Sequence, residues 1–301
     1  MSLALANPGA VRSPYGGGAA LALVGPAAVL LAGVILLPTL GVIALSLFDW
    51  DLGARTARFV GLANFQELFA SRLFWAALGN TLLYALVTTP VTLGLGLWLA
   101  LLVERSGRAR QAYLAIYLLP VLATFSAMAI AWELLLHPTI GPVNTLLHEI
   151  GLSPPNWLRD RRWVLPTFMV IGVWQHLGLA VLLFTGGLKA IPRDLYDAAA
   201  MDGAHGAMDR LRVVVLPNLG GIMVFLTTLL SLKSIEMFDK PQVLSGGGPG
   251  FASETLMHTL FAESFLYLRT GFGAALTVTF LVLTVSLAML RRGAGRRPQG
   301  E

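Results

Sequence analysis

The stretch "LFWAALGNTLLYALVTTPVTLGLGLWLALLV", residues 73–103, decides the class of fold. It carries no charged side chain over a length well beyond the roughly 20 apolar residues that a helix needs to cross a bilayer. The whole chain agrees with this: it has 301 residues, of which 56% are hydrophobic and 12% are charged. Soluble proteins carry about 25% charged residues. The sequence therefore predicts an integral membrane protein and not a large soluble core.

Outward from that stretch, further apolar runs predict an all-α membrane domain over residues 19–290 with six transmembrane helices. Residues 1–18 are too weakly basic and too polar for a cleavable signal, so the first apolar run is expected to stay as a membrane anchor. A loop at residues 189–212 joins the fourth and fifth spans, and residues 291–301 form a basic tail. The six spans are expected at about residues 19–48, 73–103, 112–136, 163–188, 213–232 and 271–290.

The basic residues predict the orientation of these spans. The net charge is +5, and the arginines stand at the ends of the apolar runs, so we assign the positive charge to membrane orientation and not to nucleic acid. Lys and Arg are denser on the side that holds both termini and the 189–212 loop, and this side is therefore expected to be cytoplasmic. The tail "RRGAGRRPQGE" is expected to stop translocation and to touch anionic lipid. The chain is predicted to be a multi-pass protein of a bacterial-type cytoplasmic membrane.

Several kinds of chemistry have no signal in the sequence. There is no cysteine, and the five histidines are scattered without metal-ligand spacing. The glycine-rich "SGGGPG" at residues 245–250 lacks the lysine and the Ser or Thr that a nucleotide-binding P-loop requires. No Walker A motif occurs elsewhere in the sequence. We expect no catalytic residue, no metal and no cofactor bound by this chain.

The segment "PRDLYDAAAMDGAHG" predicts a short helix inside the 189–212 loop. Pro192 suits a first turn, Asp194 places negative charge near the helix N-terminus, and Gly203 is a natural stop with positive φ. A helix of two to three turns is marginal alone, so it is expected to pack against its own spans and against a partner. An ordinary helix leading back into the fifth span is the alternative. By i+3 and i+4 spacing, neighbouring rows of its surface hold Leu195, Ala198, Ala199 and Asp202.

"LYDAAAMDGA" followed by "VVVLPNL" resembles the EAA loop of the permease subunits of ABC importers. In that family the loop forms a cytoplasmic coupling helix that binds a separate ATPase. Asp197 replaces the usual glutamate, and the stretch from Gly203 to Pro217 is one residue longer than the family pattern, which leaves the register of the ATPase contacts open. The resemblance implies ATPase contacts at Asp197, Ala198, Ala199, Asp202, Gly203 and Pro217.

Other motifs resemble the carbohydrate-importer permeases of the maltose and glycerol-phosphate type. They include "FVGLANFQELF", the stretch at residues 80–103, "YLLP", "AWELLLHPTIGPVNTLL" and "FDKPQVLSGGGPGFASETL". The resemblance implies a second homologous permease, an ATPase dimer that carries ATP and Mg²⁺, and an extracytoplasmic solute-binding protein. An ion-gradient-driven secondary transporter is the alternative, although the inverted repeats typical of that class are not detected. A membrane scaffold without transport is a third interpretation.

Polar and aromatic residues inside the apolar runs are candidates for a sugar path. Sugar sites combine aromatic faces for ring CH groups with amides or acids for hydroxyls. His176 as a packing histidine, Lys233 with Glu236 as a structural ion pair, and the tryptophans as interface anchors are the alternatives. The candidates for the path are Asn80, Tyr84, Trp132, Trp174, Gln175, His176, Glu236 and Asp239.

Overall fold

The computed structural model describes residues 17–295, and the side chains of residues 22–289. Most of the predicted N-terminal segment and the end of the basic tail therefore lie outside the described residues. The described chain is mainly helical, with connecting loops and a two-stranded hairpin in which β1 (Phe48–Asp49) pairs antiparallel with β2 (Arg58–Phe59). The α-helices are α1 (Gly17–Leu31), α2 (Leu37–Leu45), α3 (Ala63–Ala70), α4 (Arg72–Arg105), α5 (Arg110–Leu122), α6 (Phe125–Leu135), α7 (Pro142–Glu149), α8 (Val164–Ala190), α9 (Arg193–Met201), α10 (Ala207–Arg210), α11 (Leu216–Asn218), α12 (Gly220–Ile235), α13 (Leu256–Phe261) and α14 (Thr270–Gly295). Short π-helical turns cover Ala32–Leu36, Leu211–Val215, Pro241–Ser245 and Ala262–Leu266, and a 3-10 turn covers Gly107–Ala109.

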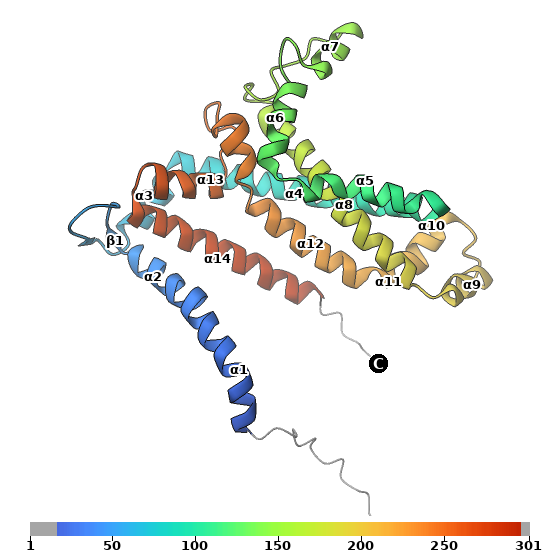
Figure 1. The fold of residues 1–301 in the computed structure, drawn as a ribbon, viewed down its shortest axis with the longest axis horizontal. Coiled ribbons are helices and arrows are strands. Elements are labelled where there is room, and N and C mark those ends of the chain that lie inside the picture. The colour runs from blue at the N-terminus through green and yellow to red at the C-terminus, as the bar shows by residue number, and fades with distance from the viewer. Residues whose placement is uncertain (1–16, 296–301) are drawn as a thin grey trace, which may run out of the picture.

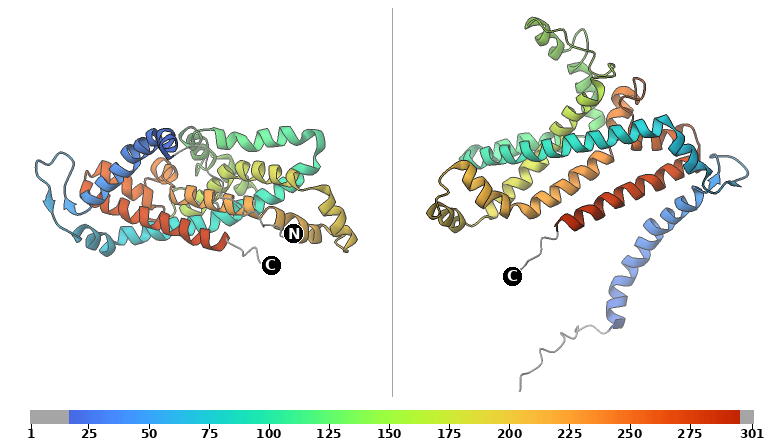
Figure 2. Two further views of the ribbon diagram at one scale, coloured as in Figure 1. Left: turned by 90° about the horizontal axis from the view of Figure 1, so that it is seen from below. Right: turned by 180° about the vertical axis from the view of Figure 1, so that it is seen from behind.

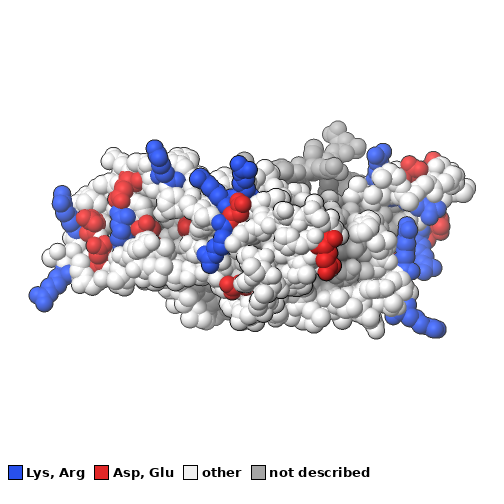
Figure 3. Space-filling model, turned by 90° about the horizontal axis from the view of Figure 1, so that it is seen from above, with Lys and Arg blue, Asp and Glu red and all other residues white. Residues whose placement is uncertain are grey.

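The long helices form an elongated bundle (Figure 1). Helices α4, α5, α12 and α14 run roughly along the long axis and α8 crosses the bundle obliquely, with the hairpin and α3 at one end and α9 at the other. Helices α1 and α2 leave the body of the bundle, and the α6–α7 segment projects from it on another side (Figure 2). Charged side chains gather toward both ends, with a third group between them, on an otherwise largely uncharged face (Figure 3). The two end groups match the placement of charge at the ends of membrane spans.

The helices support four to six membrane crossings among the described residues. Four helices are long and apolar enough by themselves: Ala22–Leu45, Arg72–Arg105, Val164–Ala190 and Thr270–Met289. The segments predicted as the third and fifth spans are bent pairs, by 99° between α5 and α6 and by 72° between α10–α11 and α12. The count of six crossings therefore depends on each bent pair being one span.

The helices differ from two of the predicted spans for identifiable reasons. The third span was expected at about residues 112–136, and within it Ala123 and Thr124 have extended backbone and separate α5 from α6. The first span was expected to reach residue 48, but its helix ends at Leu45 because Phe48 pairs with Phe59 in the hairpin. In both places backbone geometry ends a helix inside an apolar run, which hydropathy cannot detect.

Small residues let the central helices approach closely. A Cβ atom added to Gly96 of α4 would lie 2.6 Å from the Cβ of Ala180 on α8, closer than real Cβ contacts allow. A Cβ atom added to Gly178 on α8 would overlap the backbone carbonyl of Tyr117 on α5. Close backbone approach through small residues is the main source of helix association in membranes, where lipid supplies no hydrophobic driving force between helices.

We predict that Gly178→Leu destabilises the bundle by at least about 1–3 kcal/mol, because the carbonyl of Tyr117 belongs to a helix backbone and cannot move aside like a side chain. Gly186→Leu is the matched control: it lies on the same helix, and a Cβ atom there meets nothing within 4 Å. Thermal unfolding of both variants in detergent measures the difference. Equal melting temperatures for the two variants would show that α5 and α8 are not in close contact.

Candidate functional site

The predicted loop helix is present as α9, and its end has the geometry that glycine favours. Pro192 precedes the first turn and Asp194 lies within it. The N–H of Ala204 donates to the carbonyl of Ala199 at 2.8 Å, and the N–H of Gly203 donates to the carbonyl of Ala200 at 3.1 Å. This pair of bonds is a Schellman motif, and Gly203 has the expected positive φ, 89°. The helix and its glycine stop are confirmed as structure.

The orientation of α9 corrects one expectation. Ala199 was expected to offer a small surface to a partner, but it is only 5% exposed and belongs to an internal cluster with Val214 and Val215. Asp197 and Ala198 face outward instead. Helical spacing gives neighbouring rows but does not say which row packs inward, and the packing against Val214 decides it here. The exposed residues among the predicted ATPase contacts are Asp197, Ala198, Asp202, Gly203 and Pro217.

Tyr196 lies on the same buried side of α9 as Ala199 and packs with it against the cluster that contains Ala100 of α4 and Leu188 of α8. Tyr196 is half-buried, and burial, with the nearby negative charge of Glu104 as a second cause, raises the pKa of its hydroxyl. Glu104, at the end of α4, also pairs with Arg110 at 3.4 Å. Helix α9 is therefore packed against the ends of several bundle helices and does not hang free in its loop.

A second site lies within the bundle, where α4, α8 and the end of α12 meet. Five of the eight candidates for the path line one cavity of ≈ 280 Å³. Tyr84 comes from α4, and the other residues come from the middle of α8 and from the segment after α12. The structure therefore brings together residues that lie more than 150 positions apart in the sequence. The five candidates are Tyr84, Gln175, His176, Glu236 and Asp239.

Lys240 is the charged member of this cavity that the sequence analysis missed, and Met237 and Phe238 also line it. It is 2% exposed, and its Nζ donates to Oε1 of Gln175 at 2.8 Å. Oδ1 of Asp239 lies 3.4 Å from the same Nζ, and the ring centroid of Phe125 lies 4.6 Å from it. A buried ammonium needs such partners, since an unpaired buried charge is strongly unfavourable. The "FDKP" sequence gave no sign that its lysine points inward.

The other polar groups of the cavity have simpler surroundings. Nδ1 of His176 lies 2.8 Å from the carbonyl oxygen of Gly172 one turn earlier, so this histidine is bonded within its own helix and not to a neighbouring span. Lys233 and Glu236 form the predicted i, i+3 ion pair at 3.4 Å, with about half of each side chain exposed. An exposed pair of this kind contributes little stability, which leaves both charges accessible to a solute.

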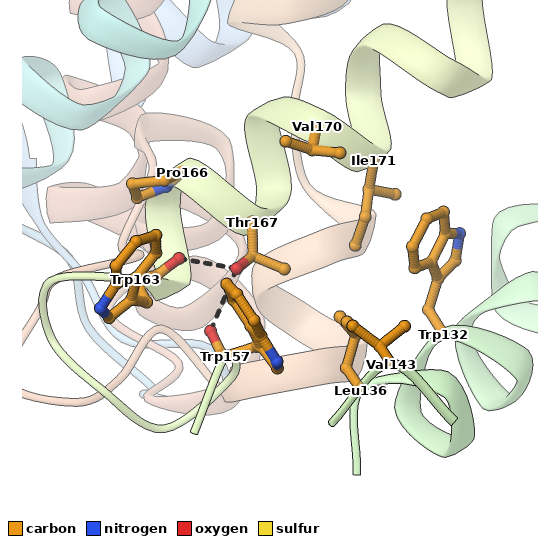
Figure 4. Close-up of a pocket in the computed structure, with 9 residues that line it drawn as sticks. All are labelled: Trp132, Leu136, Val143, Trp157, Trp163, Pro166, Thr167, Val170 and Ile171. Carbon is orange, nitrogen blue, oxygen red and sulfur yellow. Dashed lines mark hydrogen bonds between the residues drawn. The ribbon is translucent and has the colours of Figure 1, made fainter. Parts of the chain in front are cut away.

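Three candidates lie outside this cavity. Nδ2 of Asn80 donates to the carbonyl oxygens of Phe251 and Glu254, each at 2.9 Å, and so holds the loop that contains these two residues against α4. Trp132 and Trp174 pack edge to face with centroids 5.3 Å apart. Trp132 also lines a separate apolar pocket of ≈ 160 Å³ (Figure 4). These three side chains therefore make their contacts outside the cavity around Tyr84.

Three tryptophans, several aliphatic side chains and one threonine line the apolar pocket around Trp132. Trp157 and Trp163 stand beside it with ring centroids 5.3 Å apart. The hydroxyl of Thr167 donates to the carbonyl of Trp163 at 2.7 Å and lies 3.3 Å from that of Trp157, so its polar atom is satisfied (Figure 4). The pocket therefore presents few polar groups to a sugar, and we do not place it on the path.

No group of three or more histidine and acidic side chains suited to a metal occurs in residues 17–295. The site therefore consists of two parts: an anchored helix at one end of the bundle, and a polar cavity between the helices that lead away from it. The first part exposes Asp197 and Ala198, and the second is lined by polar side chains that can form hydrogen bonds.

The chain is similar in sequence and in fold to known proteins. The chain is 31% identical over 271 residues to the sulfoquinovosyl glycerol transport system permease protein SmoG of Agrobacterium fabrum, covering 88% of this chain and 86% of that one. It is 31% identical over 263 residues to the trehalose/maltose transport system permease protein MalF of Thermococcus litoralis, covering 87% and 88%. A crystal structure of a bacterial alginate ABC transporter with an alginate pentasaccharide-bound periplasmic protein contains a chain of the same fold, with a TM-score of 0.80, 20% identity, and coverage of 92% and 94%. No protein-family model matches the chain.

The fold and these relatives define a membrane subunit of an ABC transporter. The chain belongs to the permease subunits of the sugar and glycerol-phosphate class of these transporters.

We predict that Gln175→Leu lowers the stability of the protein by about 1–3 kcal/mol, because it removes a hydrogen-bond acceptor from the buried ammonium of Lys240. Gln242→Leu makes the same chemical change at an exposed position close to Lys240 in sequence. Melting temperatures of the two purified variants test the prediction. A melting temperature of Gln175→Leu equal to that of the wild type would contradict the prediction.

Proposed function

We propose that this chain forms half of the translocation path of an ATP-driven importer for a sugar, an oligosaccharide or a related polyol or glycerol-phosphate compound. The observation that carries the proposal is α9, a short helix anchored by Ala199, with Asp197 and Ala198 facing outward. The names of the relatives support the class of solute, since they include sulfoquinovosyl glycerol, trehalose/maltose and sn-glycerol-3-phosphate systems. ATP hydrolysis is assigned to partner chains, and this chain performs no covalent chemistry.

The proposed assembly contains a second homologous permease, an ATPase dimer that holds ATP and Mg²⁺, and an extracytoplasmic solute-binding protein. The alginate transporter of similar fold was crystallised in complex with a periplasmic protein, which supports the last of these partners. The helix over Ala22–Leu45 supports a partner within the membrane, because none of its most apolar part is buried by this chain. Lipid or the second permease covers that surface in this proposal.

Motion of the ATPase reaches the cavity through packed side chains. Ala199 fixes α9 to Val214 and Val215, and the same cluster contains Phe184 and Leu188 of α8. Helix α8 continues without a break from Ala190 back to Gln175 and His176 in the polar cavity. A displacement of α9 therefore moves cavity residues as part of a rigid helix, and the cavity opens alternately to the two sides.

Both termini and α9 are placed in the cytoplasm, because basic residues are denser on that side. Since the chain contains no cysteine, His205→Cys offers a single exposed labelling site close to α9. Labelling of this site by a membrane-impermeant reagent added outside intact cells would contradict the orientation.

We predict that Ala198→Trp reduces ATPase copurification at least tenfold, a change of about 1.4 kcal/mol, while the permease stays folded. The new side chain stands on the exposed face of α9, where it obstructs docking without entering the bundle. Asp197→Ala is expected to be milder, since one charge near a helix end contributes about 0.3–1 kcal/mol. Membrane level, ATPase copurification and uptake are measured together.

Two further variants complete this test. Ala70→Trp places the same side chain on an exposed alanine at the opposite end of the bundle and should leave attachment unchanged. Ala199→Trp should instead lower the melting temperature, because Ala199 is buried against Val214. Full attachment of the ATPase and full uptake with Ala198→Trp would show that α9 is not the docking surface.

We predict that Glu236→Gln lowers uptake more than it lowers the amount of assembled transporter, because Glu236 lines the polar cavity and is half-exposed to a passing solute. Glu149→Gln, an exposed acid at the end of α7, is the control for loss of one negative charge. Uptake of the solute that the partner binding protein takes, divided by transporter level, is the measured quantity. Uptake equal to that of Glu149→Gln would leave Glu236 with a structural role only.

A further inference from the structure

A second and larger cavity lies where α4 and α8 begin. Its volume is ≈ 680 Å³, and it is bounded on one side by the outer loop around Phe251. Three of the residues that line it are arginines: Arg72 at the first residue of α4, and Arg161 and Arg162 just before α8. We call this space the arginine cavity.

The three arginines of the cavity are exposed, and the described part of the chain does not pair their charge. No acidic residue lines it, and none of its three arginines forms an ion pair with another residue of the described part of the chain. The acid nearest in sequence, Asp160, accepts the backbone N–H of Arg162 at 2.7 Å, but it does not line the cavity. By contrast, Arg269 of the same bundle end is paired with two glutamates.

The two helices add positive potential to the same place. Helices α4 and α8 run parallel, as the contacts of Tyr84 with Gly172 and of Gly96 with Ala180 require. Their N-termini both face the arginine cavity, at Arg72 and next to the lining residue Leu165. A helix N-terminus carries the equivalent of roughly half a positive charge. Two such ends with three guanidinium groups make a site for an oxyanion.

The arginine cavity lies in line with the polar cavity around Tyr84. Asn80 of the first cavity and Tyr84 of the second are one turn apart on α4, and so share a face of the helix. Leu165 and His176 are eleven positions apart on α8, which is close to three full turns. A solute that leaves the first cavity along these helices therefore meets the second.

We propose that the arginine cavity binds the acidic group of the transported solute, a phosphate, sulfonate or carboxylate, before the solute enters the Tyr84 cavity. Guanidinium groups suit this role because their planar fork donates two hydrogen bonds to one oxyanion. The proposal rests on the proposed function and narrows its substrate class from any sugar, oligosaccharide, polyol or glycerol-phosphate compound to one that carries a negative charge.

The test uses the full chain in nanodiscs of phosphatidylcholine, with sn-glycerol 3-phosphate as the probe and glycerol as its uncharged partner. Calorimetric titration is expected to show saturable binding of the phosphate compound and no binding of glycerol. Arg161→Gln with Arg162→Gln should raise the Kd at least tenfold. The control, Arg55→Gln with Arg58→Gln, removes two exposed arginines from the hairpin region and should leave the Kd unchanged.

A second arm separates a solute from a lipid headgroup. Nanodiscs that contain phosphatidylglycerol should give the same Kd as phosphatidylcholine alone. Loss of probe binding in their presence would assign the cavity to anionic lipid and overturn the proposal, as would equal effects of the two double variants or equal binding of glycerol. Copurification of the ATPase is scored separately on the same preparations, so failure of anion binding with the ATPase still attached rejects this inference and not the transport function.

Discussion

The close parallel packing of α4 against α8 is the constraint on which the other features depend. Gly96 meets Ala180 with no room for a further methyl group, and the ring of Tyr84 fills the space beside Gly172. These two contacts fix both the separation and the relative direction of the helices. Because the helices are parallel, they begin together at the arginine cavity and together line the polar cavity. A bulky residue at either contact would separate the two helices and open the walls of both cavities.

Packing against α4 and α8 also orders the short helix α9. A nine-residue helix is marginal alone, and α9 is ordered because Ala199 is buried in the cluster that holds the ends of α8 and α12. The Schellman motif at Gly203 turns the chain back so that Ala204 joins the same cluster. The buried Ala199 and the exposed Asp197 therefore mark the two sides of α9: one side packs against the bundle, and the other is exposed.

Much of the fold could be predicted from the sequence because its signals are local. Uncharged length identified the membrane domain, and Pro192 with Gly203 bounded α9 to within a residue or two. The break at Ala123 and the inward side of α9 could not be predicted, since both depend on which surfaces pack together. The site was partly predictable for the same reason. Polar residues inside spans marked Gln175 and His176, whereas the inward course of Lys240 follows from its bond to Gln175 across the bundle.

The central claim is that the outward face of α9 binds a separate ATPase, and photo-crosslinking tests it most directly. A photoreactive amino acid is placed at Ala198 in one preparation and at the exposed Ala70 in another, and the membranes are irradiated before purification. Mass spectrometry then identifies what each position has captured. The account predicts an adduct between Ala198 and a nucleotide-binding subunit, and no such adduct from Ala70. Capture of that subunit from Ala70 alone, or only lipid adducts from Ala198, would contradict it.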